Sequence, residues 1–284
     1  MTDQTGFAIL EDIARDLSSE KVVFPTFLDI TFQVRSALKN PNLTLDQLAL
    51  LVGAEPLMSA KIIRMANSAA LNPSGRPIAD VKTAVGRIGM EAVRSISFAV
   101  AMEQLLESKK MAPFEGLSQR LWQHSIHTAA LCRVLARKCA RIHPDEAMFA
   151  GLVHDIGVFY LLSRAANFPE LIADKAGLHA LLVQWHDNIG HALLAALGQP
   201  EAVLDAVRDH EIARPLADIG ELRSLGDLLF LANRLANHRG GWRDPAYLPP
   251  GEPAPEMPCD LAAVDALLAE SETELASLRA ALGG

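Results

Sequence analysis

A histidine and an aspartate stand side by side in an otherwise apolar stretch. Residues 147–162 read AMFAGLVHDIGVFYLL, and His154 and Asp155 are the strongly polar residues of that window. A helix this apolar is expected to be buried, and an ionisable pair inside a protein must be paired or hydrogen-bonded. Two interpretations satisfy the pair. Either Asp155 accepts hydrogen bonds from backbone or from another histidine, or both side chains bind a metal ion.

Further histidines lie on the segments that flank this pair. His124 belongs to an amphipathic stretch just before it, His186 and His191 lie near the start of a later helix, and His210 lies near the end of the next one. Imidazole and carboxylate ligands together suit iron, manganese, zinc or nickel. Metal binding and a buried polar network that fixes the helix packing both stay open at this point.

Several motifs resemble the HDOD family, whose members are relatives of the HD metal-dependent phosphohydrolases. The first half carries NPNLTLDQLA over 40–49, KIIRMANSAA over 61–70 and AVGRIGMEAVR over 84–94. The second half carries LWQHS over 121–125, AGLVHDIG over 150–157, HDNIGHALL over 186–194 and GQPE over 198–201. The resemblance covers roughly 22–238. It implies an all-α bacterial signalling module for which hydrolase activity is not demonstrated.

The related HD-GYP phosphodiesterases suggest which residues would be ligands. By that resemblance His124, His154, Asp155, His186 and His210 match ligand positions. Two positions are altered, since Asp209 replaces a histidine and Asn233 replaces an aspartate, and the GYP signature is absent from EIARPLADIG at 211–220. Asp209 could still ligate, whereas Asn233 is neutral and weaker. The resemblance therefore implies a partly dismantled site for an iron, manganese or zinc ion.

The elements that must position these residues are expected to be helices. Apolar residues recur at helical spacing between prolines, and no useful alternating strand pattern occurs. We predict an all-α fold with two helical subdomains and a C-terminal helix. The segments are an N-terminal helix in 1–20, an N-terminal helical subdomain over 21–112, an HD-like subdomain over 113–242, a proline-rich linker over 243–258 and an acidic amphipathic helix over 259–284.

Finer predictions concern individual helices. Thr44 and Gln47 fit a capping box, the helical stretch 81–106 should break near Gly89, and one continuous helix is expected at about 145–162. The C-terminal stripe, interrupted at Ser271, should dock back on the domain. A coiled-coil homodimer is its alternative.

Charge excludes some classes of function. The formal net charge is −8, which argues against a general nucleic-acid or membrane-surface binder. Residues 44–65 also fit a helix-turn-helix template, but its second helix is mostly apolar, and Lys61 and Arg64 are expected on a solvated face. Direct DNA binding is therefore disfavoured.

Composition also bears on the compartment. The three cysteines contain no CxxC pair, so no disulfide framework or structural zinc site is expected. Neither a signal peptide nor a membrane-spanning run is expected, which predicts a cytoplasmic protein.

Together these observations favour a non-enzymatic regulatory protein of HDOD type. It would act through protein–protein interaction, with a nucleotide, another small molecule or a metal in the degenerate site or in a groove between the subdomains. The alternative is a metal-dependent phosphohydrolase or phosphodiesterase acting on a nucleotide or cyclic dinucleotide.

Overall fold

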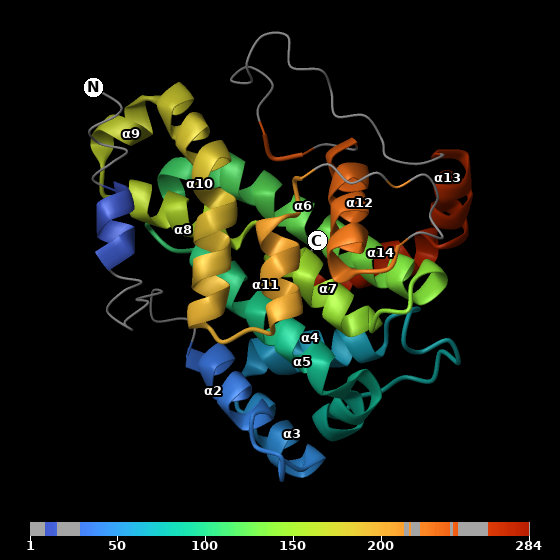
Figure 1. Cartoon of the computed structure of the whole chain (residues 1–284). Helices are drawn as coiled ribbons and strands as arrows, with labels where there is room; N and C mark the ends of the chain where they lie inside the picture. The colour runs from blue at the N-terminus through green and yellow to red at the C-terminus, as the bar shows by residue number, and fades with distance from the viewer. Residues whose placement is uncertain are drawn as a thin grey trace.

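The computed structural model describes residues 9–15, 29–212, 216, 222–238, 241–243 and 261–283. Helices dominate these ranges, and no strand occurs in them, so the predicted all-α class is confirmed. The predicted proline-rich linker over 243–258 lies outside the described residues, apart from Arg243. Figure 1 shows the helices in the order of the chain.

The first group of helices follows the expected punctuation. The Thr44 hydroxyl accepts the Gln47 N–H at 3.2 Å and the Gln47 side chain accepts the Thr44 N–H at 3.0 Å, so the capping box is confirmed. The predicted break near Gly89 is also confirmed, because Gly89 has φ 80° and interrupts the helical stretch Val81–Leu106. The helices of this group are a short segment over residues 9–15, α2 (Asp29–Leu38), α3 (Leu45–Gly53), α4 (Pro56–Ala66) and α5 (Val81–Leu106).

The asparagine of the KIIRMANSAA segment, Asn67, has a structural role. The Asn67 amide oxygen accepts the N–H of Ile78 at 2.8 Å, and its nitrogen donates to the carbonyl of the same residue at 2.7 Å. This two-point contact holds the loop between α4 and α5 against the end of α4. These two hydrogen bonds explain why an asparagine is suited to position 67.

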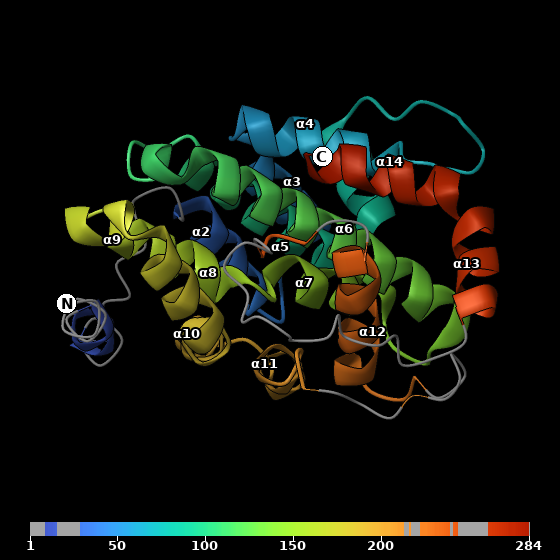
Figure 2. The same ribbon diagram turned by 90° about the horizontal axis from the view of Figure 1, so that it is seen from above.

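The second group of helices carries the histidines. In Figure 2, α6 and α7 lie between α4 and α14 on one side and α10 to α12 on the other. The group consists of η2 (Ala112–Phe114), α6 (Glu115–Cys139), α7 (Pro144–Val153), α8 (Ile156–Ala165), α9 (Pro169–Ala173), α10 (Lys175–Ala196), α11 (Glu201–Arg208) and α12 (Leu225–His238).

The expected continuous helix over 145–162 is wrong. α7 ends at Val153 and α8 begins at Ile156, with Asp155 at φ −98° and ψ 19° between them. Consecutive residues of an unbroken helix point about 100° apart. The break lets His154 and Asp155 turn their side chains into one space.

Two glycines allow the helices around this break to approach closely. A Cβ at Gly151 would lie 2.8 Å from Ala129 Cα of α6, and a Cβ at Gly157 would overlap the His186 carbonyl oxygen and lie 2.8 Å from Gly190 N of α10. Side chains at these positions would force the helices apart. The glycine of the HDIG motif is thus required by helix packing.

The C-terminal stripe packs against the chain itself. It forms α13 (Leu261–Glu270) and α14 (Glu272–Leu282), which break at Ser271, and α14 contacts α4 and α6. Figure 2 shows α14 beside α4. Apolar positions of α14 such as Leu275 and Leu278 are buried, and Arg137 of α6 pairs with Glu274.

The expectation that Lys61 lies on a solvated face is wrong. Lys61 is 2% exposed, and its Nζ lies 2.7 Å from Glu103 Oε1 and donates to the Leu282 carbonyl at 3.2 Å. Arg64 donates to the Ala280 carbonyl at 3.3 Å. These contacts satisfy the carbonyls at the end of α14. The helix α4, which matches the second helix of a helix-turn-helix template, therefore binds the end of the C-terminal helix α14.

One stretch of the described chain is long and apolar enough to cross a membrane. It comprises the 22 residues Pro144–Ala165, which span α7 and α8, and 94% of its most apolar window is buried inside the protein. Burial of this kind is typical of core helices.

Candidate metal centre

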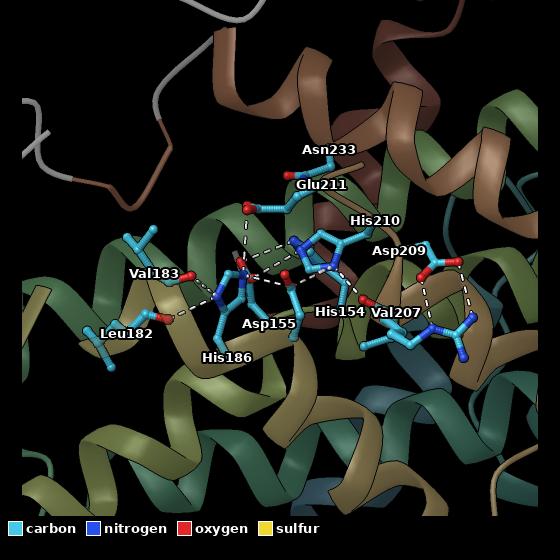
Figure 3. A network of polar contacts seen from close by, with 12 residues as sticks. His154, Asp155, Leu182, Val183, His186, Val207, Asp209, His210, Glu211 and Asn233 are labelled. Atoms are coloured by element: carbon cyan, nitrogen blue, oxygen red, sulfur yellow. Dashed lines mark hydrogen bonds and ion pairs between the residues drawn. The ribbon is translucent and has the colours of Figure 1, made fainter. Parts of the chain in front are cut away.

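The structure brings most of the predicted ligands into one buried cluster, shown in part in Figure 3. They come from α6, the break between α7 and α8, α10, the turn after α11, and α12. None is more than 3% exposed. The residues of this histidine–aspartate centre are His124, His154, Asp155, His186, His210 and Asn233.

Asp155 occupies the middle of the centre. Its Oδ2 lies 3.1 Å from His154 Nε2 and 3.7 Å from His124 Nε2. Its Oδ1 lies 3.6 Å from His210 Nε2 and 3.8 Å from His186 Nε2. One carboxylate therefore faces four imidazoles, two at each oxygen. Burial opposes the charge, but His154, His210 and His124 together hold the pKa of Asp155 well below its usual value.

Backbone carbonyls orient three of the rings. The Nδ1 atoms of His154, His186 and His210 lie 2.8 Å from Gly151 O, 2.9 Å from Leu182 O and 2.6 Å from Val207 O, respectively. A carbonyl can only accept, so each Nδ1 carries a proton. With Nδ1 held in this way, each ring turns its Nε2 toward Asp155, and Nε2 is the atom that would bind a metal ion once its proton is lost.

The donor atoms fit a cation. Both Asp155 oxygens and the Nε2 atoms of His186 and His210 are buried, and none has a hydrogen-bond partner of suitable geometry in the described part of the chain. Buried polar atoms without a partner are rare in native proteins. Ligands that bind one ion at about 2.0–2.2 Å must lie within about 4.4 Å of each other, and the distances from Asp155 to these two rings meet that limit.

The His124 side of the centre is satisfied differently. His124 Nε2 lies 3.0 Å from Asn233 Oδ1, which also accepts from Asn237 Nδ2 at 3.0 Å. Burial and the neighbouring His154 lower the pKa of His124 to about 4. The ring is therefore neutral, and it can donate its Nε2 proton to the asparagine oxygen. Asn233, the position at which the resemblance to HD-GYP phosphodiesterases implies an aspartate, thus joins a hydrogen-bond network.

Two carboxylates that the sequence analysis did not single out complete the cluster. Asp187 Oδ1 lies 3.0 Å from His186 Nε2 and 3.3 Å from His210 Nδ1, and Glu211 Oε1 lies 3.7 Å from His186 Nε2. Although burial opposes it, Asp187 and Glu211 raise the pKa of His186 to about 10. The Nε2 proton that this pKa implies occupies the position that a metal ion would take. Adjacency to a candidate histidine was the available signal for both acids.

Asp209 does not join the centre. Its carboxylate oxygen lies 2.9 Å from Arg208 Nε, and Figure 3 shows it apart from the rings. The sequence suggests Asp209 as a possible ligand, but the acid that lies near His186 is Glu211, which follows His210 in the chain. Glu211 also pairs with Arg243, and despite burial His186, His210 and Arg243 lower the pKa of Glu211 to about 2.

The HDOD domain profile matches residues 24–213. The chain belongs to the HDOD family. The resemblance seen in the sequence is thereby confirmed, and the histidine–aspartate centre of this HDOD protein lies partly within the matched range, with Asn233 beyond it.

Solved structures share the fold. A protein of Shewanella amazonensis SB2B, provisionally named a metal-dependent phosphohydrolase, is 23% identical, covers 98% of this chain and 99% of its own, and has a TM-score of 0.73. An HDOD domain protein of unknown function from Geobacter sulfurreducens is 20% identical, with 95% and 96% covered and a TM-score of 0.60. At these identities the similarity shows the fold alone.

A curated relative matches at a similar level. An uncharacterized protein of Treponema pallidum (strain Nichols) is 24% identical over 195 residues, which are 63% of this chain and 36% of the relative. This chain therefore matches about a third of the length of that protein.

Proposed function

We propose that this HDOD protein is a non-enzymatic regulatory protein of the cytoplasm, which acts through contacts with partner proteins and holds a divalent metal ion in the histidine–aspartate centre. The observation that carries the proposal is the contrast within the centre. Within the described residues, donor atoms of Asp155, His186 and His210 are buried and close together without a hydrogen bond of suitable geometry, whereas His124 and Asn233 bond to each other. The centre keeps donor atoms that could bind an ion, whereas Asn233 stands where the resemblance to hydrolytic relatives implies a carboxylate.

The chain's own residues define what the centre would hold. Asp155, His186 and His210 would bind the ion, with Asp187 and Glu211 close enough to balance its charge. Mixed imidazole and carboxylate donors suit manganese, iron or zinc. A bound ion of this kind supplies a Lewis acid and can lower the pKa of a bound water. Gly151, Leu182 and Val207 keep the three rings in the orientation that binding needs.

A specific observation favours a second function. Asp187 and Glu211 bring two carboxylates within reach of His186, which offsets the loss of charge at Asn233. The alternative is therefore a metal-dependent phosphohydrolase acting on a nucleotide or a cyclic dinucleotide.

Metal content and hydrolysis separate the two functions. The protein is purified without chelator, its metal is measured by mass spectrometry, and hydrolysis of bis(4-nitrophenyl) phosphate and of cyclic dinucleotides is assayed with Mn²⁺. We expect bound metal and no hydrolysis, with metal lost in Asp155→Asn. Asp209→Asn is the matched control, since Asp209 pairs with Arg208 outside the centre. Hydrolysis that disappears in both His154→Ala and Asp155→Asn would overturn the non-enzymatic proposal.

Partner binding is tested with protein tagged at its N-terminus, because Gly283 packs against Glu103 and Lys61. Proteins captured from the native cell are purified and mixed with this chain. Co-elution as one species in size-exclusion chromatography supports the regulatory proposal. If every captured protein elutes separately, the proposed mode of action is wrong.

A further inference from the structure

A cavity of about 370 Å³ lies at one end of the molecule, between the start of α6, α9 and the first turns of α10. Figure 2 shows these helix ends close together at the end where α9 lies. The apolar part of its wall includes Phe114, Leu117, Ile172, Leu178 and Leu182. A cavity of this size falls within the range of small-molecule sites, roughly 300–1,000 Å³.

The charged and ionisable part of the wall is entirely basic. Arg120, Lys175 and His179 line the cavity, and no acidic residue from the described part of the chain does. In a chain with net charge −8 this is a local reversal of sign. Within the described ranges, no ion pair is formed by Arg120 or Lys175, although other basic residues of the chain, such as Arg164 and Lys138, do form them.

The acids closest in sequence are directed elsewhere. Glu115 accepts a hydrogen bond from Gln119 Nε2 at 3.2 Å, and Asp174 accepts the N–H of Gly177 at 2.9 Å. Neither carboxylate lines the cavity. Arg120 and Lys175 are exposed whereas His179 is buried, so the fixed positive charges lie at the mouth and the apolar wall lies deeper.

We propose that this cavity binds a small amphipathic organic anion, with its acidic head group at Arg120 and Lys175 and its apolar body against Leu117, Ile172 and Leu182. Arginine and lysine bind carboxylate and phosphate groups by charge-assisted hydrogen bonds. Burial of the apolar body supplies the hydrophobic part of the affinity. Nothing in this assignment requires a metal ion.

The cavity also adjoins the histidine–aspartate centre. Leu182 lines the cavity, and its carbonyl accepts the Nδ1 proton of His186 at 2.9 Å. The His179 ring lies 6.2 Å from Trp242, whose ring stands edge-on to His186 at 5.8 Å. One face of α10 thus contacts both sites. We expect anion binding and metal binding to be coupled, a consequence that rests on the proposed metal site.

The anion site is tested with 8-anilinonaphthalene-1-sulfonate, which fluoresces when an apolar pocket takes it up, and with octanoate, octyl phosphate and octanol as competitors. We expect saturable binding of the dye, displacement by either anion and little displacement by octanol. The double variant Arg120→Gln/Lys175→Gln should bind at least about tenfold more weakly, and Ile172→Trp should block the cavity. The relative strength of octanoate and octyl phosphate identifies the head group.

The matched control is Lys109→Gln/Lys110→Gln, which removes two exposed charges outside the cavity. It should bind the dye within about twofold of the wild-type protein. Equal affinity in the Arg120/Lys175 variant and in this control would overturn the proposal, as would an absence of displaceable dye or equal competition by octanol. Circular dichroism checks that each variant is folded.

Coupling is measured by titrating Mn²⁺ with and without saturating octanoate. Because linkage is reciprocal, octanoate should change the Mn²⁺ affinity by the factor by which Mn²⁺ changes the octanoate affinity, typically about fivefold or more. Unchanged affinities overturn the coupling. If Mn²⁺ does not bind at all, the proposed metal site fails, while the dye titration still decides the anion site.

Discussion

Lys61 and Asp155 are charged residues buried to nearly the same degree, at 2% and 1% exposure, but their surroundings differ. The Lys61 ammonium group contacts Glu103 Oε1 and the Leu282 carbonyl, both within hydrogen-bond distance. The oxygens of Asp155 lie among histidine nitrogens and, within the described ranges, accept no hydrogen bond of suitable geometry. We refer to Lys61, Glu103, Leu282 and Gly283 as the Lys61 cluster. The buried ammonium of that cluster is paired within the chain, whereas the histidine–aspartate centre is where we propose a cation binds.

The same difference in hydrogen bonding distinguishes the polar motif residues of the first half of the chain from those of the second half. The polar motif residues of the first half, such as Thr44 and Asn67, bond to the backbone of their own segment. Three histidines of the second half bond to backbone carbonyls through Nδ1, but their Nε2 atoms face Asp155 and one another. Since buried polar groups in native proteins are normally satisfied, the unsatisfied set is where a ligand is expected. The predictions below test that distinction, from the largest expected effect to the smallest.

Glycines in the two regions should respond differently to alanine. A Cβ at Gly157 would overlap the His186 carbonyl, which is backbone and cannot move alone, so Gly157→Ala should lower the free energy of unfolding by about 3 kcal/mol. A Cβ at Gly283 would overlap the end of the flexible Glu103 side chain, at φ 109°, so Gly283→Ala should cost about 1 kcal/mol. Urea unfolding followed by circular dichroism measures both.

Gly86→Ala is the control for these variants, because beyond its own helix backbone no atom of the described residues lies within 4 Å of the added Cβ. It should leave the stability unchanged or raise it slightly, since alanine favours a helix over glycine. A Gly157→Ala protein as stable as this control would show that α8 and α10 can separate without cost.

Metal should stabilise the protein through the centre alone. At a free Mn²⁺ concentration of about 100 times Kd, the wild-type protein should gain about 2.7 kcal/mol, and EDTA should reverse the gain. Lys61→Met should show the same gain and Asp155→Asn none. Denaturant titrations with Mn²⁺ and with EDTA measure it. An equal gain in Asp155→Asn would place the ion elsewhere.

Removal of the Lys61 charge should destabilise the protein regardless of metal. Lys61→Met leaves the Glu103 carboxylate and the end of α14 without their partner. Glu103 is 22% exposed and partly solvated, so the loss should be about 2 kcal/mol, below that of a fully buried pair. Unfolding in EDTA measures it. The double variant with Glu103→Leu should recover part of the loss, and no recovery would contradict the pairing.

Restoring a carboxylate beside His124 should strengthen the metal site. Asn233→Asp adds a negative charge 3.0 Å from His124 Nε2, and we expect Mn²⁺ affinity to rise about tenfold, or about 1.4 kcal/mol. Isothermal titration calorimetry measures the change. Asn237→Asp, one helical turn away, should give a smaller rise. Unchanged affinity in Asn233→Asp would show that a charge at this position does not act on the ion, and would contradict the expected gain.

Much of the local structure could be predicted from the residues. The capping box at Thr44 and the break at Gly89 depend on neighbouring residues only, so the chain encodes them locally. The break at His154 and Asp155 was not predictable from the apolar pattern, because a continuous helix satisfies the same pattern. Contacts of Gly151 and Gly157 with α6 and α10 accompany that break, and those helices are distant in sequence.

The sequence by itself determined the donor set: a His-Asp pair in an apolar window, and histidines on the surrounding helices. It did not determine which acids would accompany them. Only the tertiary structure places Glu211 near His186 and Asp209 beside Arg208. The two acids precede and follow His210 in the turn after α11, so their side chains point in different directions. Lys61 is likewise buried only in the tertiary structure, because α14, from the C-terminal end of the chain, packs against α4. Residue types fix what chemistry is available, and helix packing decides which atoms meet.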